Sequence, residues 1–285
     1  MGNIPYFELG AARSGTKILR DTLEAHPGFT TTNYPLDDEI WSYGQEDAPH
    51  DAFPPESLTD DIERHVRSEF EKRMGGDIQF IEKNVNHSLR IPYISEIYQD
   101  TKFIHIIRDG RDCIRSTREM WKHPIDWKYY VTSKGWELSP TTIVFYMFRL
   151  GGKFLKRLFT GSDRVDYWGI KVPELADMVQ NKPLLEVCAL QWEVAVNKAR
   201  EDGRELPEDR YFELRYETLM KSPEEVLPDL AEFLEFPDVD PMMEFAQKQY
   251  RTSSIGKWRE VLTEQEQQRI HDEVGSTLED LGYEL

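Results

Sequence analysis

A short segment near the N-terminus limits the folds open to this chain more than any other feature. Residues 4–9 are mostly apolar and predict a buried strand, the next ten residues read GAARSGTKIL, and residues 16–25 predict a helix. Gly10 and Gly15 have the spacing of a phosphate-binding loop. A strand, a glycine loop and a helix in this order present the free N–H groups and partial positive charge of a helix N-terminus to an anion.

The loop departs from the form found in kinases and ATPases. There a lysine follows the second glycine and reaches the terminal phosphates, and the next hydroxyl binds magnesium. Here Thr16 comes first and Lys17 second. Gly15 permits a close backbone approach to an anion. Ser14 and Thr16 add hydroxyl groups, while Arg13 and Lys17 add charge. The pattern predicts an anion site and counts against a P-loop kinase or ATPase.

A second basic segment follows the clearest predicted strand, residues 102–107. Arg108 stands at the carboxyl end of this strand, where open α/β sheets bind their ligands. Ser116 follows eight residues later. The arginine fork is well shaped for a phosphate dianion, so Arg108 and Ser116 are candidates for a phosphate site. Arg115 and Arg118 recur at helical spacing and fit a solvated helix face paired with nearby acids.

Strands and helices are expected to alternate along the chain. Two more strands are predicted at residues 79–82 and 211–214, and residues 30–60 read as a long loop or lid. Further helices are expected over residues 60–74, 89–99, 111–120, 141–159 and 184–200, and the chain after residue 214, to about residue 281, reads as mostly helical. This order predicts an α/β fold with a central parallel sheet, helices on both faces and a P-loop nucleotide-binding architecture. We find no repeat or linker and expect a single domain over residues 1–285.

The charge balance excludes some classes of function. The chain has 53 acidic and 35 basic residues and a formal net charge of −18, which argues against a nucleic-acid binder. No apolar run approaches the roughly 20 residues that span a bilayer, so no membrane span is expected. Two cysteines and the lack of a signal-peptide pattern indicate a cytoplasmic protein. No histidine has metal-ligand spacing, so no metal is expected.

Four segments together resemble the P-loop sulfotransferase superfamily, in a bacterial-type member. These enzymes use 3′-phosphoadenosine 5′-phosphosulfate (PAPS). GAARSGTKILRDTLEAHP is similar to the loop that binds the 5′-phosphosulfate, and KFIHIIRDGRDCIRS is similar to the segment that binds the 3′-phosphate. Residues 215–236 resemble a third block, usually R-Y-E-D-L, and residues 255–266 resemble the C-terminal G-K-W segment. The segments occur in the family's order and span nearly the whole chain.

The resemblance implies an enzyme that transfers a sulfuryl group from PAPS to a hydroxyl or amine by in-line displacement, without a metal. The acceptor, a small molecule, a glycan or a lipid, is not identified. Arg13 is implied to lie nearest the leaving oxygen, and Lys83, at the end of a strand, to contact the sulfuryl group. Lys17 stands where many members have a second Thr or Ser. The implied nucleotide-binding residues are Arg13, Ser14, Gly15, Thr16, Lys17 and Ile18 at the 5′ end, Arg108 and Ser116 at the 3′-phosphate, Tyr216 near the adenine, and Ser254, Gly256 and Lys257 over the nucleotide.

The resemblance leaves two candidates for the general base that takes the acceptor proton. His87 follows Lys83 by four residues, a longer spacing than in members with a catalytic histidine. The alternative is the acidic set of Asp37, Asp38 and Glu39, in a region where other members place a catalytic carboxylate. Apolar and aromatic neighbours slightly favour the acids.

Two other functions stay open at this point. One is a P-loop kinase or ATPase, and the other is a non-catalytic nucleotide-binding protein on the same fold. Lys83 together with a candidate base argues against the second. The aromatic-rich stretches 121–130 and 136–148 would either line an acceptor pocket or belong to the core. The oligomeric state has no signal in the sequence.

Overall fold

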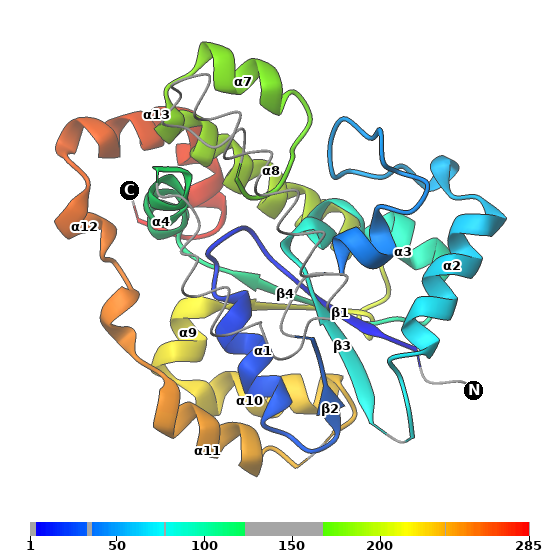
Figure 1. The fold of residues 1–285 in the computed structure, drawn as a ribbon. Helices are drawn as coiled ribbons and strands as arrows, with labels where there is room; N and C mark the ends of the chain where they lie inside the picture. The colour runs from blue at the N-terminus through cyan, green and yellow to red at the C-terminus, as the bar shows by residue number, and fades with distance from the viewer. Residues whose placement is uncertain (1–3, 33–35, 77, 123–167, 237, 285) are drawn as a thin grey trace.

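A computed structural model describes residues 4–32, 36–76, 78–122, 168–236 and 238–284. Within these ranges five strands form one parallel sheet in the order β2-β3-β1-β4-β5 (Figure 1). The strands are β1 (Tyr6–Leu9), β2 (Phe29–Thr30), β3 (Gln79–Lys83), β4 (Phe103–Ile107) and β5 (Tyr211–Arg215). The predicted α/β class is confirmed. β2 was not predicted, because two residues are too few to show a strand pattern.

Helices connect the strands and cover both faces of the sheet (Figure 1). The α-helices are α1 (Thr16–Glu24), α2 (Asp60–Glu71), α3 (Ile91–Ile97), α4 (Gly110–Lys122), α7 (Leu175–Asn181), α8 (Leu184–Arg204), α9 (Tyr216–Lys221), α10 (Pro223–Phe233), α11 (Asp240–Gln249), α12 (Trp258–Val261) and α13 (Glu264–Asp280). Short helices are the π-helix η1 (Asp37–Trp41) and the 3₁₀ helices η2 (Pro55–Ser57), η3 (Val85–Leu89) and η4 (Thr252–Ser254). The expected loop over residues 30–60 therefore contains η1 and η2. The helix expected over 141–159 and nearly all of the aromatic-rich stretches lie outside the described residues.

Successive strand residues point to opposite faces of the sheet, and each face has its own core. On one face, Ile104 and Ile106 pack with Leu19 of α1 and with α9, α10 and α11. On the other face, Phe7 and Phe103 pack with α2 and α3. A third cluster joins α4, α8 and α13. In the described ranges no helix combines the length and apolar character needed to cross a membrane.

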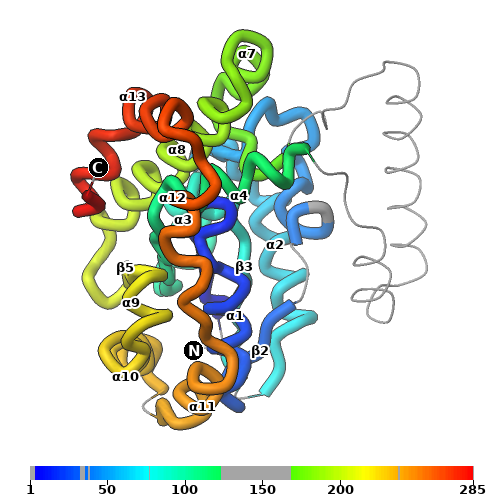
Figure 2. Tube along the Cα trace, turned by 90° about the vertical axis from the view of Figure 1, so that its left-hand side faces the viewer, coloured from blue at the N-terminus to red at the C-terminus, as the bar shows by residue number. Residues whose placement is uncertain are grey.

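The carboxyl ends of the strands gather the candidate site. The glycine loop follows β1, Lys83 ends β3, Arg108 follows β4 and Tyr216 follows β5. Because β1 lies between β3 and β4, the loop lies between Lys83 and Arg108. The chain from α11 to α12 then passes this edge of the sheet (Figure 2). There the carbonyl of Ser254 accepts from the Arg108 guanidinium at 2.6 Å.

Candidate active site

The glycine loop depends on two backbone positions with positive φ, Arg13 at 68° and Gly15 at 106°. A Cβ atom on Gly15 would lie 2.4 Å from the Tyr216 ring, so conformation and space both require glycine. Gly15 begins α1 without a side-chain cap. The N–H groups of Thr16 and Lys17 therefore have no partner within the helix. The loop presents an open helix N-terminus, which attracts anions.

The side chains of the loop point in different directions. Arg13 Nε donates to Ser116 Oγ at 2.9 Å and so joins the loop to α4. The hydroxyl of Ser14 is fully buried next to Gly10, with no hydrogen-bond partner among the described residues. Lys17 Nζ lies 2.6 Å from the Asp21 carboxylate on the outer surface of α1. The expected Ser14 hydroxyl donor and Lys17 charge are therefore turned away from the open side of the loop.

The other two expected loop residues are held by packing. Thr16 is buried, and Ile18 packs at the edge of the core under α1. The backbone of both belongs to the first turn of α1. Their contribution to an anion site is through this turn rather than through exposed side chains.

Arg108 links the loop to the C-terminal part of the chain. Besides its bond to Ser254, its guanidinium donates to the carbonyl of Arg13 at 3.3 Å. The guanidinium also lies 4.3 Å from the centre of the Tyr216 ring, and the Tyr216 hydroxyl is 2.8 Å from Ser254 Oγ. Together with the bond from Arg13 to Ser116, these contacts make one connected group from residues far apart in the sequence.

Tyr216 supports the loop and Arg108, and its expected place near the adenine stays a prediction. Its ring lies between Gly15 and the Arg108 guanidinium, and the residue is only 7% exposed. Little ring surface is left for a stacked base. The ring instead fixes the loop relative to Arg108.

A buried carboxylate fixes the C-terminal segment to α4. Asp112 accepts hydrogen bonds from the N–H groups of Gly256 at 2.7 Å and Trp258 at 2.9 Å. Burial raises the pKa of Asp112, while Arg108, 3.6 Å away, opposes that rise. Lys257, between the two anchored residues, is exposed. The sequence suggested only helix-surface ion pairing for Asp112, because nothing local signals its two backbone partners.

Lys83 lies beside Glu8, its register partner on the neighbouring strand β1. Burial lowers the pKa of the Lys83 amine and raises the pKa of the Glu8 carboxyl well above its usual range. The opposite charge of each partner counters the effect of burial on the other. Glu8 had no functional signal in the sequence, because it lies within a strand predicted as buried.

Comparison with known proteins identifies the family. A family model described as "Sulfotransferase family" matches residues 5–139 and 174–241, well over half of the chain. The chain belongs to the sulfotransferase family. It is therefore a sulfotransferase enzyme, and the kinase or ATPase alternative is not favoured. A comparison with curated protein sequences finds no match.

Solved sulfotransferase structures share the fold of this sulfotransferase. The sulfotransferase domain of the Synechococcus PCC 7002 olefin synthase has a TM-score of 0.54 at 16% identity, covering 100% of this chain and 96% of that chain. The Alicyclobacillus acidocaldarius sulfotransferase has a TM-score of 0.51 at 15% identity, with 100% and 98% covered. Mouse sulfotransferase SULT7A1, complexed with PAP, has a TM-score of 0.52 at 16% identity, with 98% and 86% covered. At these identities the likeness is one of fold.

Two of the base candidates in this sulfotransferase face away from Lys83. His87 is fully buried, its Nε2 lies 3.1 Å from the Glu82 carboxylate, and its ring packs against Phe7 and Trp41. A side chain without exposed surface does not reach an acceptor, so the geometry does not favour His87. Glu39 forms an ion pair with Arg73, which follows α2.

Asp37 is joined to the residue after Lys83, unlike Glu39. Its carboxylate accepts from Asn84, the residue after Lys83, at 2.6 Å and from Arg90 at 2.7 Å. Burial alone would raise the pKa of Asp37, but the Arg90 charge and the two hydrogen bonds hold it below its ordinary value. The side chain of Asp38 lies outside the described part. Neither Asn84 nor Arg90 had a signal in the sequence.

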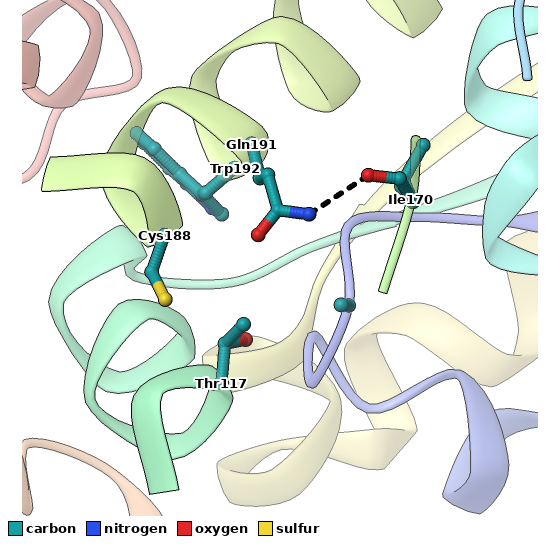
Figure 3. Close-up of a pocket in the computed structure, with 6 residues that line it drawn as sticks. Thr117, Ile170, Cys188, Gln191 and Trp192 are labelled. Carbon is teal, nitrogen blue, oxygen red and sulfur yellow. Dashed lines mark hydrogen bonds between the residues drawn. The ribbon is translucent and has the colours of Figure 1, made fainter. Parts of the chain in front are cut away.

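A small cavity lies behind the loop of the sulfotransferase (Figure 3). It is lined by Ala12, Thr117, Ile170, Cys188, Gln191 and Trp192. Gln191 Nε2 donates to the carbonyl of Ile170 at 2.8 Å, and the amide oxygen points into the cavity without a hydrogen-bond partner among the described residues. The amide thereby joins α8 to the segment that lies against the back of the loop.

Proposed function

We propose that this sulfotransferase uses PAPS as its sulfuryl donor. The observation that carries the proposal is the connected group in which the α1 N-terminus, Arg13 and Arg108 meet, in a chain with a net charge of −18. Two guanidinium groups and a helix N-terminus suit a nucleotide that carries anionic groups at both ends. The PAP complex of the mouse relative supports the same donor, since PAP (3′,5′-adenosine bisphosphate) is what PAPS becomes after transfer.

The proposed roles are those that the resemblance implies, and the contacts support them. Backbone groups from Ser14 to Ile18 and the Arg13 side chain hold the 5′-phosphosulfate. Arg108 and Ser116 hold the 3′-phosphate, and the segment with Ser254, Gly256 and Lys257 closes over the nucleotide. Asp112 and Tyr216 act behind these groups, because each fixes a backbone segment or a guanidinium.

The chemistry is an in-line displacement at sulfur. The acceptor oxygen or nitrogen forms a bond to sulfur as the bond from sulfur to the 5′-phosphate oxygen breaks, and the base takes the acceptor proton. Lys83, as an ammonium, and Arg13 stabilise the negative charge on the transferred group and the leaving oxygen. The proposal needs no metal, so turnover in the presence of a chelator is expected to be unchanged.

For the base, we propose the pair Asp37 and Asp38 at the start of η1. Asp37 accepts from Asn84, the residue after Lys83, although its lowered pKa makes it a weak proton acceptor. With an acceptor found by screening hydroxyl and amine compounds, we expect Asp37→Asn or Asp38→Asn to lower kcat by about 100-fold. Glu39→Gln serves as the matched control. Equal rates in all three variants and the wild type would overturn this assignment.

Calorimetric titration with PAP tests the donor. We expect wild-type protein to bind PAP and Arg108→Ala to bind about 10- to 100-fold more weakly, because it lacks a charge-assisted contact. Arg64→Ala, which removes an exposed arginine on α2, is the control for lost charge alone. Thermal unfolding shows that each variant is folded. A wild type that binds magnesium-ATP and not PAP would contradict the proposal, and PAP binding without turnover of any acceptor would favour a non-catalytic role.

A further inference from the structure

We propose that Glu8 is a positioning residue that keeps the Lys83 amine charged at the reacting end of the site. The catalytic role that we give this pairing rests on the proposed function, in which Lys83 stabilises the transferred group. Glu8 belongs to neither the loop nor the nucleotide-binding segments. It lies on the side of the site away from Arg108, where β1 pairs with β3.

The sheet brings Glu8 and Lys83 together. They are register partners on adjacent parallel strands, so their side chains leave the sheet on the same face. Phe7 and Phe80, one residue and three residues away from them, pack in the core of the opposite face. Glu8 and Lys83 therefore lie on the face that α1 covers.

Glu8 is fully buried and otherwise without polar partners. Its exposed fraction is 0%, and neither carboxylate oxygen has a hydrogen-bond partner among the residues that the structure describes. On the other side of β1 its register neighbour is Ile104, which is apolar. Burying a carboxylate is costly unless an opposite charge lies near it. Lys83, the register partner of Glu8 on β3, supplies such a charge.

The other charges facing the pair come from α1, where Lys17 and Arg20 share the single carboxylate of Asp21, so that one positive charge is left over. Asp21 accepts from Lys17 Nζ at 2.6 Å and from Arg20 Nε at 3.0 Å. Because two cations already share the Asp21 carboxylate, Glu8 is the carboxylate that remains to compensate the charge of Lys83. Glu82, next to Lys83 in the chain, is turned to the opposite core, where it accepts from Trp41.

The pair matters for transfer because a buried amine without a counter-charge tends to lose its proton. A neutral Lys83 would not stabilise negative charge on a sulfuryl group. The negative charge of Glu8 favours the ammonium form of Lys83, whereas burial, the larger effect, lowers the pKa of Lys83 and raises that of Glu8. Glu8 thus acts through Lys83 and need not touch a substrate.

The test is a pH titration of the Lys83 amine, observed by NMR on protein labelled with ¹³C at the lysine side chains. The Lys83 signal is assigned by its disappearance in Lys83→Arg. We expect Glu8→Gln to lower the midpoint of this titration by about one pH unit or more, as for loss of a nearby opposite charge. Glu82→Gln is the matched control: it is equally buried and one residue from Lys83, but on the other face. It is expected to leave the midpoint unchanged.

Equal midpoints in wild type and Glu8→Gln would overturn the proposal, as would equal shifts in Glu8→Gln and Glu82→Gln. Should Glu8→Gln be too unstable to titrate, denaturant unfolding of Glu8→Asp, Lys83→Met and the Glu8→Gln/Lys83→Met double variant replaces it. If Glu8 and Lys83 compensate each other's charge, two variants are expected to fold: the double variant, which lacks both charges, and Glu8→Asp, which keeps both. Failure of both variants to fold would overturn the proposal. The titration needs no ligand, so PAP binding by the wild type tests the proposed donor separately.

Discussion

At the scale of single residues, Gly15 shows how the backbone builds the site. Its φ of 106° is unfavourable for any residue with a Cβ atom, and the Tyr216 ring fills the space where that atom would lie. The same ring supports the Arg108 guanidinium. One glycine thus allows the loop, the tyrosine and the arginine to lie against one another.

Gly15→Ala is expected to lower the free energy of unfolding by about 3 kcal/mol, from backbone strain and from the clash with Tyr216. Gly76→Ala is the matched control, because Gly76 also has positive φ, 66°, but nothing lies within 4 Å of its added Cβ. There we expect about 1 kcal/mol from strain alone. Urea unfolding measures both. Equal losses would show that contact with Tyr216 contributes nothing.

Burial of His105 makes the stability of the fold depend on pH in acid solution. It is fully buried, and its Nδ1 lies 2.6 Å from the Tyr211 hydroxyl. Burial, together with the positive charges of Arg200 and Arg204, lowers the pKa of His105 to about 3, whereas an unfolded histidine titrates near 6.5. The unfolded chain therefore binds this proton first as the pH falls. The stabilisation is complete above about pH 6.5 and is lost as the pH drops toward 3.

We expect His105→Gln to remove part of this acid dependence, on the order of 1 kcal/mol per pH unit below about pH 6. Denaturant unfolding of wild type and variant at several pH values measures the two slopes. At pH values above 7 the slopes are expected to agree, which is the internal control. A variant with the wild-type slope in acid would contradict the assignment.

At the scale of elements, α4 organises the site although it supplies few of its surfaces. Its Ser116 accepts from Arg13, and its Asp112 holds the backbone of Gly256 and Trp258. α4 thereby connects the N-terminal loop to a segment about 240 residues further along the chain. The Asp112 carboxylate holds two backbone groups of this C-terminal segment, beside the bonds that Arg108 and Tyr216 make to Ser254.

Asp112→Asn tests the contribution of this carboxylate. An amide has only one acceptor oxygen for the two N–H donors, and its NH₂ group would face them. We expect a loss of about 2 kcal/mol in unfolding free energy, weaker PAP binding and faster hydrogen exchange at residues 255–258. Asp177→Asn makes the same chemical change at an exposed position on α7. Unchanged exchange in Asp112→Asn would show that other contacts hold the segment.

At the scale of the whole molecule, the cores share elements. α8 contributes Trp192 to the cluster with α4 and α13, and Ala199 to the cluster beneath α2 and α3. The Thr22 hydroxyl on α1 lies 2.8 Å from that of Tyr250, which follows α11, and Arg111 donates to the carbonyl of Glu284 at 2.7 Å. Such shared elements favour a single domain.

Scanning calorimetry is therefore expected to show one unfolding transition, with calorimetric and van't Hoff enthalpies that agree. PAP at saturating concentration is expected to raise the midpoint of the whole transition rather than of a part of it. Two separable transitions, or one that shifts with PAP while another does not, would show that the chain contains two domains.

The sequence by itself determined the features that depend on neighbouring residues. These are the strand, loop and helix around Gly15, the arginine at the end of β4 with Ser116 eight residues on, and the parallel α/β class. Apolar periodicity and glycine spacing are local properties, so they are readable without a fold. Because parallel strands carry their ligands at one edge, the sequence also predicted which loops would gather there.

Only the tertiary structure decided which way the polar side chains face and which charges they meet. His87 turned out to be buried against Glu82, Tyr216 to lie under Arg108, and Glu8 to lie across from Lys83. Each of these contacts joins residues from different elements. They follow from the strand order β2-β3-β1-β4-β5 and from the helix packing on each face, which no local pattern encodes.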